Sequence, residues 1–443
     1  MSSTALLTDR YELTMVQAAL RSGAGHRRAV FEVFARRLPK GRRYGVVAGT
    51  ARLLDAIADF RFDGDDLEWL VAEGIVDEPT ARWLANFRFT GNIDGYAEGD
   101  VFFPGSPILV VESSFAEAVL LETLVLSILN HDCAVAAAAS RMTLAAGDRP
   151  CLEMGGRRTH EHAAVAAARA AYLAGFAATS NLEAGRRYGI PTVGTSAHAF
   201  TLVHDSEEAA FRAQLTALGT ATTLLVDTYD VPTAVRTAIR LAGAELGAVR
   251  IDSGDLVTEA RAVRAQLDEL GATKTRIIVT GDLDEYAIAA LSAAPVDGYG
   301  VGTAVVTGSG APTANLVYKL VARAGESGCW RAVQKASPGK IGHGGRKWAF
   351  RRFDRRGIAE AEVIWSEAAP DHYRGGERPP LDDAHRPLLV PLIRDGEIVG
   401  REPLDAARRR HREVRNTLPP AALHLQPGDP ALPTVFAHEP PNR

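Results

Sequence analysis

The chain has 443 residues, of which 46% are hydrophobic and 23% are charged, and its formal net charge is −4 at pH 7. This length predicts more than one domain, and the composition is that of an ordinary globular enzyme. The slight acidic excess argues against a general nucleic-acid-binding protein, which would carry a surplus of Lys and Arg.

The first residues, Met1 to Asp9, have neither a basic region nor an apolar run long enough for a signal peptide. The longest apolar runs, such as Ala134 to Ala139, are far shorter than a membrane span. Cys133, Cys151 and Cys329 are widely spaced and are expected to be reduced and structural. These features predict a cytoplasmic protein that contacts no membrane.

The N-terminal part of the chain, residues 1–130, mixes helical and strand-like patterns, as expected for part of an α/β domain. The predicted helices cover 6–23, 49–60 and 115–139, and the predicted strands cover 30–34, 95–99 and 108–112.

The middle part, residues 131–330, alternates short β-branched runs with Ala- and Arg-rich helical segments. The predicted strands are 192–193, 222–226, 249–251, 276–280 and 298–301, and the predicted helices are 161–173, 207–218, 231–246, 257–270 and 284–293. Each of these strands ends in a polar, glycine-rich or acidic cluster and is followed by a helical segment, which is typical of parallel (β/α) folds. Because no Gly-x-Gly-x-x-Gly opens a first βα unit, we favour a barrel over an open dinucleotide-binding sheet.

In the C-terminal part, residues 331–443, the pattern weakens to one predicted strand at 360–365 and one helix at 404–418, with an irregular tail from about 419. A basic stretch contains Lys335, Lys340, Arg346 and Lys347. It is either a solvated surface turn or a contact for a nucleotide phosphate. The arginine run that begins at Arg408 is interpreted as a solvated helix face.

A single histidine, His198, follows a turn rich in glycine and hydroxyl groups, Gly194-Thr195-Ser196. Glycine lets the backbone come close to a ligand, and hydroxyls and free amides can hold anionic oxygens. The histidine could be a base, a phosphate acceptor or a structural hydrogen-bonding residue, and this segment alone does not separate these roles.

The other strand-end clusters supply guanidinium groups, carboxylates and glycine-rich turns. Paired arginines suit carboxylates and phosphates because each guanidinium can bind two oxygens. An aspartate beside Ser and Gly suits ribose hydroxyls or magnesium pyrophosphate. The candidate residues are Arg157, Arg158, Arg250, Asp252, Asp255, Gly281, Gly300, Gly302 and Thr303, and a further acidic cluster runs from Asp227 to Asp230.

The order of these motifs resembles that of the nicotinate phosphoribosyltransferase family over residues 5 to 350. The motifs are Thr8-Asp-Arg-Tyr11, Gly155-Gly-Arg-Arg158, Thr179-Ser-Asn181, Gly194-Thr-Ser-Ala-His198, Arg250-Ile-Asp-Ser-Gly-Asp255, Gly300-Val-Gly-Thr303 and Val317-Tyr-Lys-Leu320. The resemblance implies an irregular (β/α) barrel of the type II phosphoribosyltransferase kind beside a second α/β domain formed by both chain ends. It also implies a homodimer whose active site lies at the subunit interface.

The family resemblance further implies an activity in NAD salvage. Nicotinate, 5-phosphoribosyl 1-pyrophosphate, ATP and water would give nicotinate mononucleotide, pyrophosphate, ADP and phosphate. The resemblance implies that ATP phosphorylates His198. It also implies that Thr195 and Arg250 bind nicotinate and that Thr303 binds the phosphoribosyl pyrophosphate. Tyr11 would contact the pyridine ring, reaching the active site of the partner subunit, although a plain packing role for Tyr11 is the alternative.

Asp252 and Asp255 suit the ribose hydroxyls and Mg²⁺ in this reaction. We expect Mg²⁺ to be held through pyrophosphate, with Asp252 as a candidate contact and without a dedicated set of protein ligands. A positioned arginine such as Arg250 would stabilise the carboxylate of nicotinate far more than the neutral amide of nicotinamide.

Where many family members read Arg-Arg-Ala-Gln, this chain reads Arg157-Arg-Thr-His160-Glu-His162. The two histidines are not expected to share a metal ion, because their spacing does not bring both imidazoles to one point. One of Arg157 and Arg158 is expected to face the substrate and the other to have a structural role, and the sequence leaves open which. The segment from His131 to Cys133 is expected to be packed in the core.

Three other functions are left open by the sequence. The chain could use nicotinamide or quinolinate as its pyridine substrate, or it could be a binding homologue without catalytic activity.

Overall fold

The computed structural model describes residues 3–335, 343–367 and 382–437, which form two compact units. Unit 1 comprises Met1–Ala134 and Thr313–Arg443, and unit 2 comprises Val135–Pro312. Both chain ends therefore belong to unit 1.

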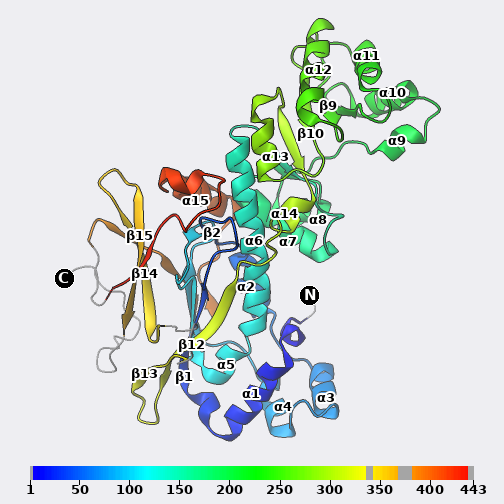
Figure 1. Ribbon diagram of the computed structural model, residues 1–443. Coiled ribbons are helices and arrows are strands. Elements are labelled where there is room, and N and C mark those ends of the chain that lie inside the picture. The colour runs from blue at the N-terminus through cyan, green and yellow to red at the C-terminus, as the bar shows by residue number, and fades with distance from the viewer. Residues whose placement is uncertain (1–2, 336–342, 368–381, 438–443) are drawn as a thin grey trace. The chain divides into compact units, whose positions relative to one another are not determined.

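The first sheet of unit 1 has seven strands and draws on both ends of the chain (Figure 1). Its strands, in spatial order, are β13 (Trp330–Ala332), β12 (Leu316–Ala324), β1 (Arg28–Ala35), β5 (Leu109–Ser114), β3 (Asn92–Tyr96), β17 (Leu389–Arg394) and β18 (Glu397–Ile398). Strand β1 pairs antiparallel with both β12 and β5. Because of the pairing with β12, the second boundary between the units lies at residue 312, whereas the sequence pattern placed it at 330.

A four-stranded sheet and a two-stranded ribbon complete the β-structure of unit 1. The sheet has the order β16 (His385–Pro387), β14 (Arg346–Phe353), β15 (Ala359–Glu367) and β19 (Thr434–Ala437), and the ribbon joins β2 (Gly45–Val46) to β4 (Val101–Phe102). Strand β15 contains the predicted strand 360–365. Strand β19 pairs parallel with β15, so part of the tail that was expected to be irregular is a strand.

The helices of unit 1 include all three that the N-terminal sequence predicts. They are α1 (Arg10–Arg21), α2 (Thr50–Ala58), α3 (Gly64–Ala72), α4 (Glu78–Ala85), α5 (Phe115–Val119), α6 (Glu122–Ala146) and α15 (Leu404–Asn416). Helices α3 and α4 were not predicted, although each starts after a good capping residue. The Asp63 carboxylate accepts from Asp66 N at 2.9 Å, and the Asp77 carboxylate accepts from Thr80 N at 2.9 Å.

The segment Phe115–Ala146 is long and apolar as a whole, although each unbroken apolar run within it is short. By length and composition it could cross a membrane, with a mean hydropathy of 1.5, but 67% of the apolar window is buried inside the protein. A core helix of a globular protein passes the same test. The boundary between the two units falls within this helix, at Ala134.

In the segment from His131 to Cys133, Asp132 and Cys133 are buried in unit 1, as predicted, and His131 is half-buried. The Asp132 carboxylate is 1% exposed and accepts from Arg52 Nη1 at 2.7 and 2.8 Å, while His131 Nδ1 lies 2.8 Å from its Oδ1. All three cysteines are free, but only Cys133 and Cys151 are buried. A packing role therefore applies to these two and not to the exposed Cys329.

The basic stretch near residue 340 contains two buried cations. Lys347 lies in β14, where its Nζ contacts the two carboxylate oxygens of Glu32 at 2.8 and 2.7 Å. The neighbouring Arg346 donates from Nη2 to Asp94 Oδ2 at 2.9 Å. Of the two alternatives, the solvated turn is wrong for both residues, because each is buried in an ion pair with an acidic side chain, and these ion pairs give no support to the alternative of a phosphate contact. Lys335 is exposed, and Lys340 lies outside the described residues.

Helix α15 confirms the predicted helix at 404–418, but its arginine run is only partly solvated. Arg409 and Arg412 are exposed. Arg410 instead forms a bidentate ion pair with Glu402, with N–O distances of 2.7 and 2.8 Å, and His411 is 2% exposed. Burial, and to a lesser degree the nearby Arg415, lowers the pKa of His411 to about 4.

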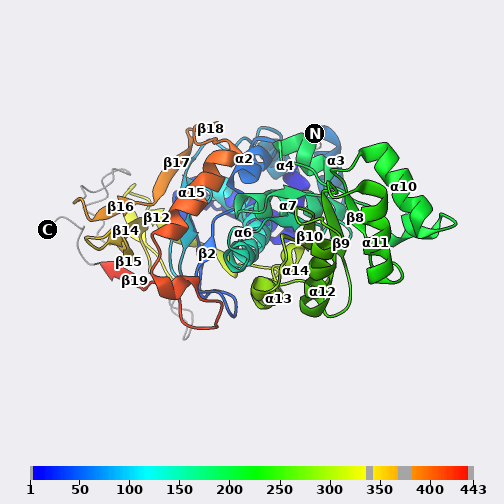
Figure 2. The same cartoon turned by 90° about the horizontal axis from the view of Figure 1, so that it is seen from above.

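Unit 2 is built on a six-stranded, all-parallel sheet (Figures 1 and 2). Its spatial order is β7 (Ala178–Thr179), β6 (Cys151–Glu153), β11 (Gly298–Val301), β10 (Arg276–Val279), β9 (Ala248–Ile251) and β8 (Thr223–Leu225). The predicted strand at 192–193 is a single parallel bridge between Thr192 and Thr179, which extends the sheet past β7. Within 135–312, which is described throughout, no strand pairing joins this side to β8. The predicted irregular (β/α) barrel is thus confirmed as an incomplete one.

Helices follow the strands of unit 2 in the predicted alternation. They are α7 (Glu161–Leu173), α8 (Leu182–Tyr188), α9 (His198–Leu202), α10 (Glu207–Leu218), α11 (Val231–Ala242), α12 (Leu256–Glu269), α13 (Glu285–Ala290) and α14 (Thr303–Val306). The bounds of α7 and α10 are those that the sequence predicts. Because every strand is parallel, the carboxyl ends of all six strands meet at one edge of the sheet.

Replacing Lys347 by Met would leave the Glu32 carboxylate buried without its partner. We expect this to lower the free energy of unfolding by about 3–5 kcal/mol, measured by urea denaturation. The double substitution Glu32→Leu with Lys347→Met should recover most of the loss, because no uncompensated charge remains. A Lys347→Met protein as stable as its parent would contradict the buried ion pair.

Candidate active site

Two adjoining cavities lie in unit 2 and share Met154, Arg157 and Arg250 in their walls. The smaller, which we call the polar cleft, has a volume of about 270 Å³, and the larger, the outer cavity, about 760 Å³. The polar cleft is lined by Met154, Arg157, Arg158, Arg250, Asp252, Thr280, Gly281, Asp282, Gly300, Gly302 and Thr303. These residues follow or end β6, β9, β10 and β11, so the cleft lies at the carboxyl edge of the sheet.

Two glycines keep the polar cleft open where β10 and β11 end. A Cβ atom on Gly300 would lie 2.5 Å from Thr280 Cγ2 and 2.8 Å from Met154 Sδ. Gly281 has a φ of +129°, a backbone conformation that side chains strongly disfavour. Both positions therefore favour glycine, Gly300 because of its close neighbours and Gly281 because of its backbone conformation.

His198 stands at the start of α9, close to the polar cleft. Its Nδ1 lies 3.2 Å from Thr228 Oγ1. Its Nε2 lies 3.8 Å from Asp252 Oδ2 and 4.0 Å from Asp227 Oδ1. The imidazole is 39% exposed, so it is accessible to a ligand while contacted by polar groups at both nitrogens.

Asp227 fixes the end of β9 beside His198 through its buried carboxylate. Its side chain is 3% exposed, and its Oδ2 accepts from Asp252 N and from Ser253 Oγ, both at 2.8 Å. Its Oδ1 is buried and has no hydrogen-bond partner within the described chain. Asp252 is fixed at its other oxygen, because Thr280 Oγ1 donates to Asp252 Oδ1. The sequence placed Asp227 in an acidic cluster at a strand end but gave it no separate role.

Arg250 connects the two cavities. Its Nη1 donates to Thr195 Oγ1, and its buried Nε has no partner within the described residues. Burial lowers the pKa of Arg250, while the carboxylates of Asp252 and Asp227 oppose this shift. The predicted pair of Thr195 and Arg250 is therefore brought together, with donor capacity left over for a ligand.

Arg157 and Arg158 both line the polar cleft, and Arg157 also lines the outer cavity. Both are exposed, and neither guanidinium has a hydrogen bond or ion pair to another side chain in the described part of the chain. The expected division between one substrate-facing and one structural arginine is therefore not observed.

Two predicted residues are not among those that line the cleft. Asp255 caps α12, where its Oδ1 accepts from Val257 N at 3.2 Å and from Thr258 N at 3.3 Å. The hydrogen bonds from Thr258 lower the pKa of Asp255. Tyr11 belongs to unit 1, where it lies in the first turn of α1 and is 42% exposed. Its contact with a pyridine ring stays a prediction.

Sequence reasoning gave no role to Glu153, a buried carboxylate behind the arginine loop. The side chain accepts from Gly155 N and from Thr179 Oγ1, both at 2.5 Å, and burial raises its pKa. It thereby ties the end of β6 to the end of β7 and fixes the turn that carries Arg157. The signal in the sequence was an acidic residue that ends a short apolar strand.

The segment that departs from the family pattern has a local structural role. His160 caps α7, since its Nδ1 accepts from His162 N at 3.3 Å. His162 and Glu161 line the outer cavity.

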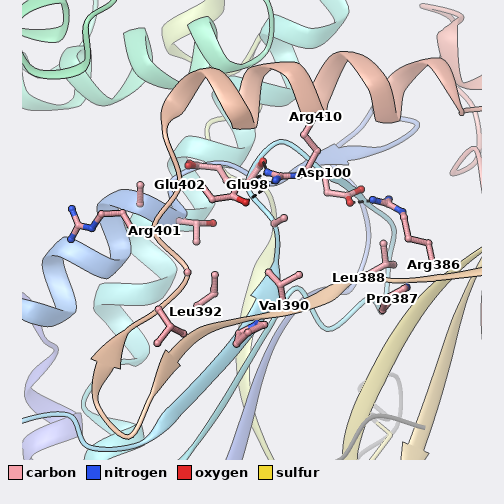
Figure 3. A pocket seen from close by; sticks show the side chains of 16 residues that line it. Glu98, Asp100, Arg386, Pro387, Leu388, Val390, Leu392, Arg401, Glu402 and Arg410 are labelled. Atoms are coloured by element: carbon pink, nitrogen blue, oxygen red, sulfur yellow. Dashed lines mark hydrogen bonds and ion pairs between the residues drawn. The ribbon is translucent and has the colours of Figure 1, made fainter. Parts of the chain in front are cut away.

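A further cavity of about 300 Å³ lies in unit 1, between the start of α2, β17 and α15 (Figure 3). Each of its three arginines is paired with a carboxylate: Arg386 with Asp100, Arg401 with Asp55 and Arg410 with Glu402. Its cations are thus already engaged, unlike those of the polar cleft. The candidate active site is therefore the polar cleft with the adjoining outer cavity and His198.

Two family models of known proteins together match most of the chain. Residues 6–130 match the nicotinate phosphoribosyltransferase N-terminal domain, and residues 150–341 match the nicotinate phosphoribosyltransferase family. The chain is 59% identical over 437 residues to nicotinate phosphoribosyltransferase pncB1 of Mycobacterium tuberculosis, covering 97% of this chain and 94% of that protein. It is 37% identical to the nicotinate phosphoribosyltransferase of Bacillus subtilis over 360 residues, covering 79% of this chain and 73% of that protein.

Solved structures show the same fold. The crystal structure of human nicotinic acid phosphoribosyltransferase aligns with a TM-score of 0.81 and 25% identity, covering 97% of each chain. The nicotinate-nucleotide pyrophosphorylase from Pyrococcus furiosus aligns with a TM-score of 0.75 and 24% identity, covering 94% of this chain and 95% of that one.

Adding a methyl group at Gly300 would push Thr280 and Met154 out of place, and Thr280 holds Asp252. We expect Gly300→Ala to weaken the binding of inorganic pyrophosphate by about tenfold or more, measured by calorimetry. Gly64→Ala is the matched control, because no atom lies within 4 Å of a Cβ atom at Gly64. Unchanged pyrophosphate binding by Gly300→Ala would argue against the polar cleft as the phosphate site.

Proposed function

The chain belongs to the nicotinate phosphoribosyltransferase family, and from that premise we propose that it makes nicotinate mononucleotide from nicotinate and phosphoribosyl pyrophosphate, in a reaction coupled to ATP through His198. The observation that carries the proposal is the position of His198. Its imidazole lies between Thr228 and the carboxylates of Asp227 and Asp252, and Asp252 is itself part of the polar cleft.

Nicotinate is expected to bind where the two cavities meet. Arg250 and Thr195 already contact each other there, and the free donors of the guanidinium suit a carboxylate. The neutral amide of nicotinamide would gain much less from this cation. This pair of residues therefore supports nicotinate over nicotinamide as the substrate.

The sugar phosphate is expected to occupy the polar cleft. Arg157 and Arg158 supply cations for its phosphates, and the close-packed turns at Gly281, Gly300 and Gly302 admit them near the backbone. The pyridine nitrogen attacks the anomeric carbon as the bond to pyrophosphate breaks, and the electron pair of that bond leaves with the pyrophosphate. Asp252 lies at the edge of the cleft, where a carboxylate can hold ribose hydroxyls and stabilise a cationic sugar.

Mg²⁺ fits the same edge of the cleft. Asp252 Oδ2 makes no hydrogen bond within the described chain, and carboxylate oxygens are ligands that Mg²⁺ prefers. When bound, Mg²⁺ would neutralise charge on the departing pyrophosphate. No group of three or more His, Cys, Asp or Glu side chains is placed to hold a metal among the described residues. Pyrophosphate and water would supply the other ligands.

We place the ring proton of His198 at Nε2, because two carboxylates lie on that side of the ring. With Asp252 and Asp227 on the Nε2 side, the hydrogen is held at Nε2, and the lone pair lies at Nδ1. Nδ1 can then attack the γ-phosphorus of ATP, and the bond from that phosphorus to the bridging oxygen breaks to release ADP. The phosphorylated ring is cationic, and the two carboxylates stabilise it. Later attack by water on the phosphorus returns the electron pair to Nδ1 and releases phosphate.

The remaining features of the proposal rest on the family. We infer a homodimer in which Tyr11 of one subunit completes the active site of the other, and a cytoplasmic role in NAD salvage. Tyr11 is exposed at the start of α1, which is consistent with a contact outside its own unit.

The proposal is tested by measuring mononucleotide formation from nicotinate, nicotinamide and quinolinate, each with phosphoribosyl pyrophosphate and Mg²⁺. Each assay is run with and without ATP while consumed ATP is counted. Product from nicotinate alone, with ATP turned over alongside, is the expected result. Product from another pyridine would identify that pyridine as the substrate in place of nicotinate. No product from any of the three would favour a binding homologue.

His198→Ala should abolish stimulation by ATP, because the residues that line the polar cleft include no imidazole that could replace it. The measurement is the ratio of initial rates with and without ATP at saturating nicotinate. His204→Asn, just beyond α9, is the matched control and should keep the stimulation of the parent. Stimulation retained by His198→Ala would remove His198 as the phosphate carrier.

A further inference from the structure

Thr228 is a polar contact of His198 to which the proposed reaction assigns no part. It directly follows Asp227 at the end of β8, and its Oγ1 lies 3.2 Å from His198 Nδ1. No other hydrogen bond of this hydroxyl occurs in the described chain. The hydroxyl is therefore available to the imidazole alone.

The direction of this hydrogen bond follows from the carboxylates on the other side of the ring. Because Asp252 and Asp227 favour the ring hydrogen at Nε2, Nδ1 carries a lone pair and can only accept. Thr228 therefore donates to the nitrogen that would attack ATP. A hydroxyl rotates freely about its Cβ–O bond, so the same hydrogen can turn to an oxygen of a phosphoryl group bound at Nδ1.

The backbone around Thr228 gives the hydroxyl a fixed position. Asp227 is 3% exposed and receives two hydrogen bonds from the β9 end of the sheet, from Asp252 N and Ser253 Oγ. Because Thr228 is the next residue in the chain, these hydrogen bonds also restrict the position of its backbone. The imidazole is by contrast 39% exposed and begins a short helix, so its own orientation needs an outside contact.

We propose that Thr228 is the positioning residue of the ATP-coupled step. Its hydroxyl holds the rotamer of His198 in the resting site by donating to Nδ1, gives up this hydrogen bond as the phosphate donor approaches the lone pair, and then donates to the transferred phosphoryl group. This inference rests on the proposed phosphorylation of His198. It assigns Thr228 no contact with nicotinate or with the sugar, so its loss should affect coupling to ATP and not the choice of pyridine.

The test compares Thr228→Val, which keeps the branched shape without the hydroxyl, with Thr228→Ser, which keeps the hydroxyl. The readouts are formation of phosphohistidine from labelled ATP and the number of ATP molecules consumed per mononucleotide. For Thr228→Val we expect the rate of phosphohistidine formation to fall about tenfold or more, as for a lost hydrogen bond to a charged group. Thr228→Ser should stay within about threefold of the parent.

Thr216→Val is the control for a surface threonine, since Thr216 is exposed on α10 and bonds only Arg212 O. It should match the parent in both readouts. If Thr228→Val is poorly folded by circular dichroism, Thr228→Ala takes its place in the comparison with Thr228→Ser. Phosphohistidine formation by the hydroxyl-free variant at the parental rate, or equal losses in Thr228→Val and Thr228→Ser, would overturn the inference.

The parent protein and His198→Ala separate this inference from the proposed function. If the parent forms no phosphohistidine, the ATP-coupled function itself fails, and Thr228 has nothing to position. If the parent forms it, His198→Ala does not, and Thr228→Val still does, only the role of Thr228 is refuted.

Discussion

The buried carboxylate of Asp227 makes the contacts on which the candidate active site depends. One of its oxygens binds Asp252 N and Ser253 Oγ, and the other faces His198 Nε2. A desolvated carboxylate with an unpaired oxygen is costly unless a positive charge can form beside it. In the proposed reaction a phosphorylated His198 would supply that charge, so phosphorylation would stabilise the buried carboxylate. The same carboxylate sets the place of Asp252 in the cleft and, through the chain, of Thr228.

The fold makes this arrangement possible by bringing parallel strand ends together. Unit 2 gathers Arg157, Arg250, Asp252 and Gly300 from the carboxyl ends of three strands, β6, β9 and β11. Unit 1 is organised differently, because antiparallel strands from both chain ends are joined through buried ion pairs such as Lys347 with Glu32. Such pairs add little net stability but penalise any pairing that leaves one charge alone. This penalty disfavours other arrangements of the strands and so helps to specify the pairing of the two ends of the chain.

The sequence was sufficient for the parallel alternation in unit 2, since its short apolar strands and capped helices repeat with clear polar ends. It was also sufficient to gather Thr195, Arg250, Asp252 and Gly300 at one edge. It could not show that Lys347 is buried, because the acidic partner lies 315 residues away. Nor could it separate a cleft-lining aspartate from a helix cap: Asp252 and Asp255 share one motif, and only Asp252 lines the cleft. The contact of Thr228 with His198 depends on the spacing of β8 and α9, which no local pattern encodes.

The most direct measurement is a single-turnover chase of protein carrying a labelled phosphoryl group on His198. The labelled protein is mixed with nicotinate, phosphoribosyl pyrophosphate and Mg²⁺, and label release and mononucleotide formation are followed together. The account predicts that the label leaves as inorganic phosphate with the formation of product, one for one, and is released much more slowly when nicotinate is omitted. Equal release with and without nicotinate, or product formed while the label stays on the protein, would contradict coupling through His198.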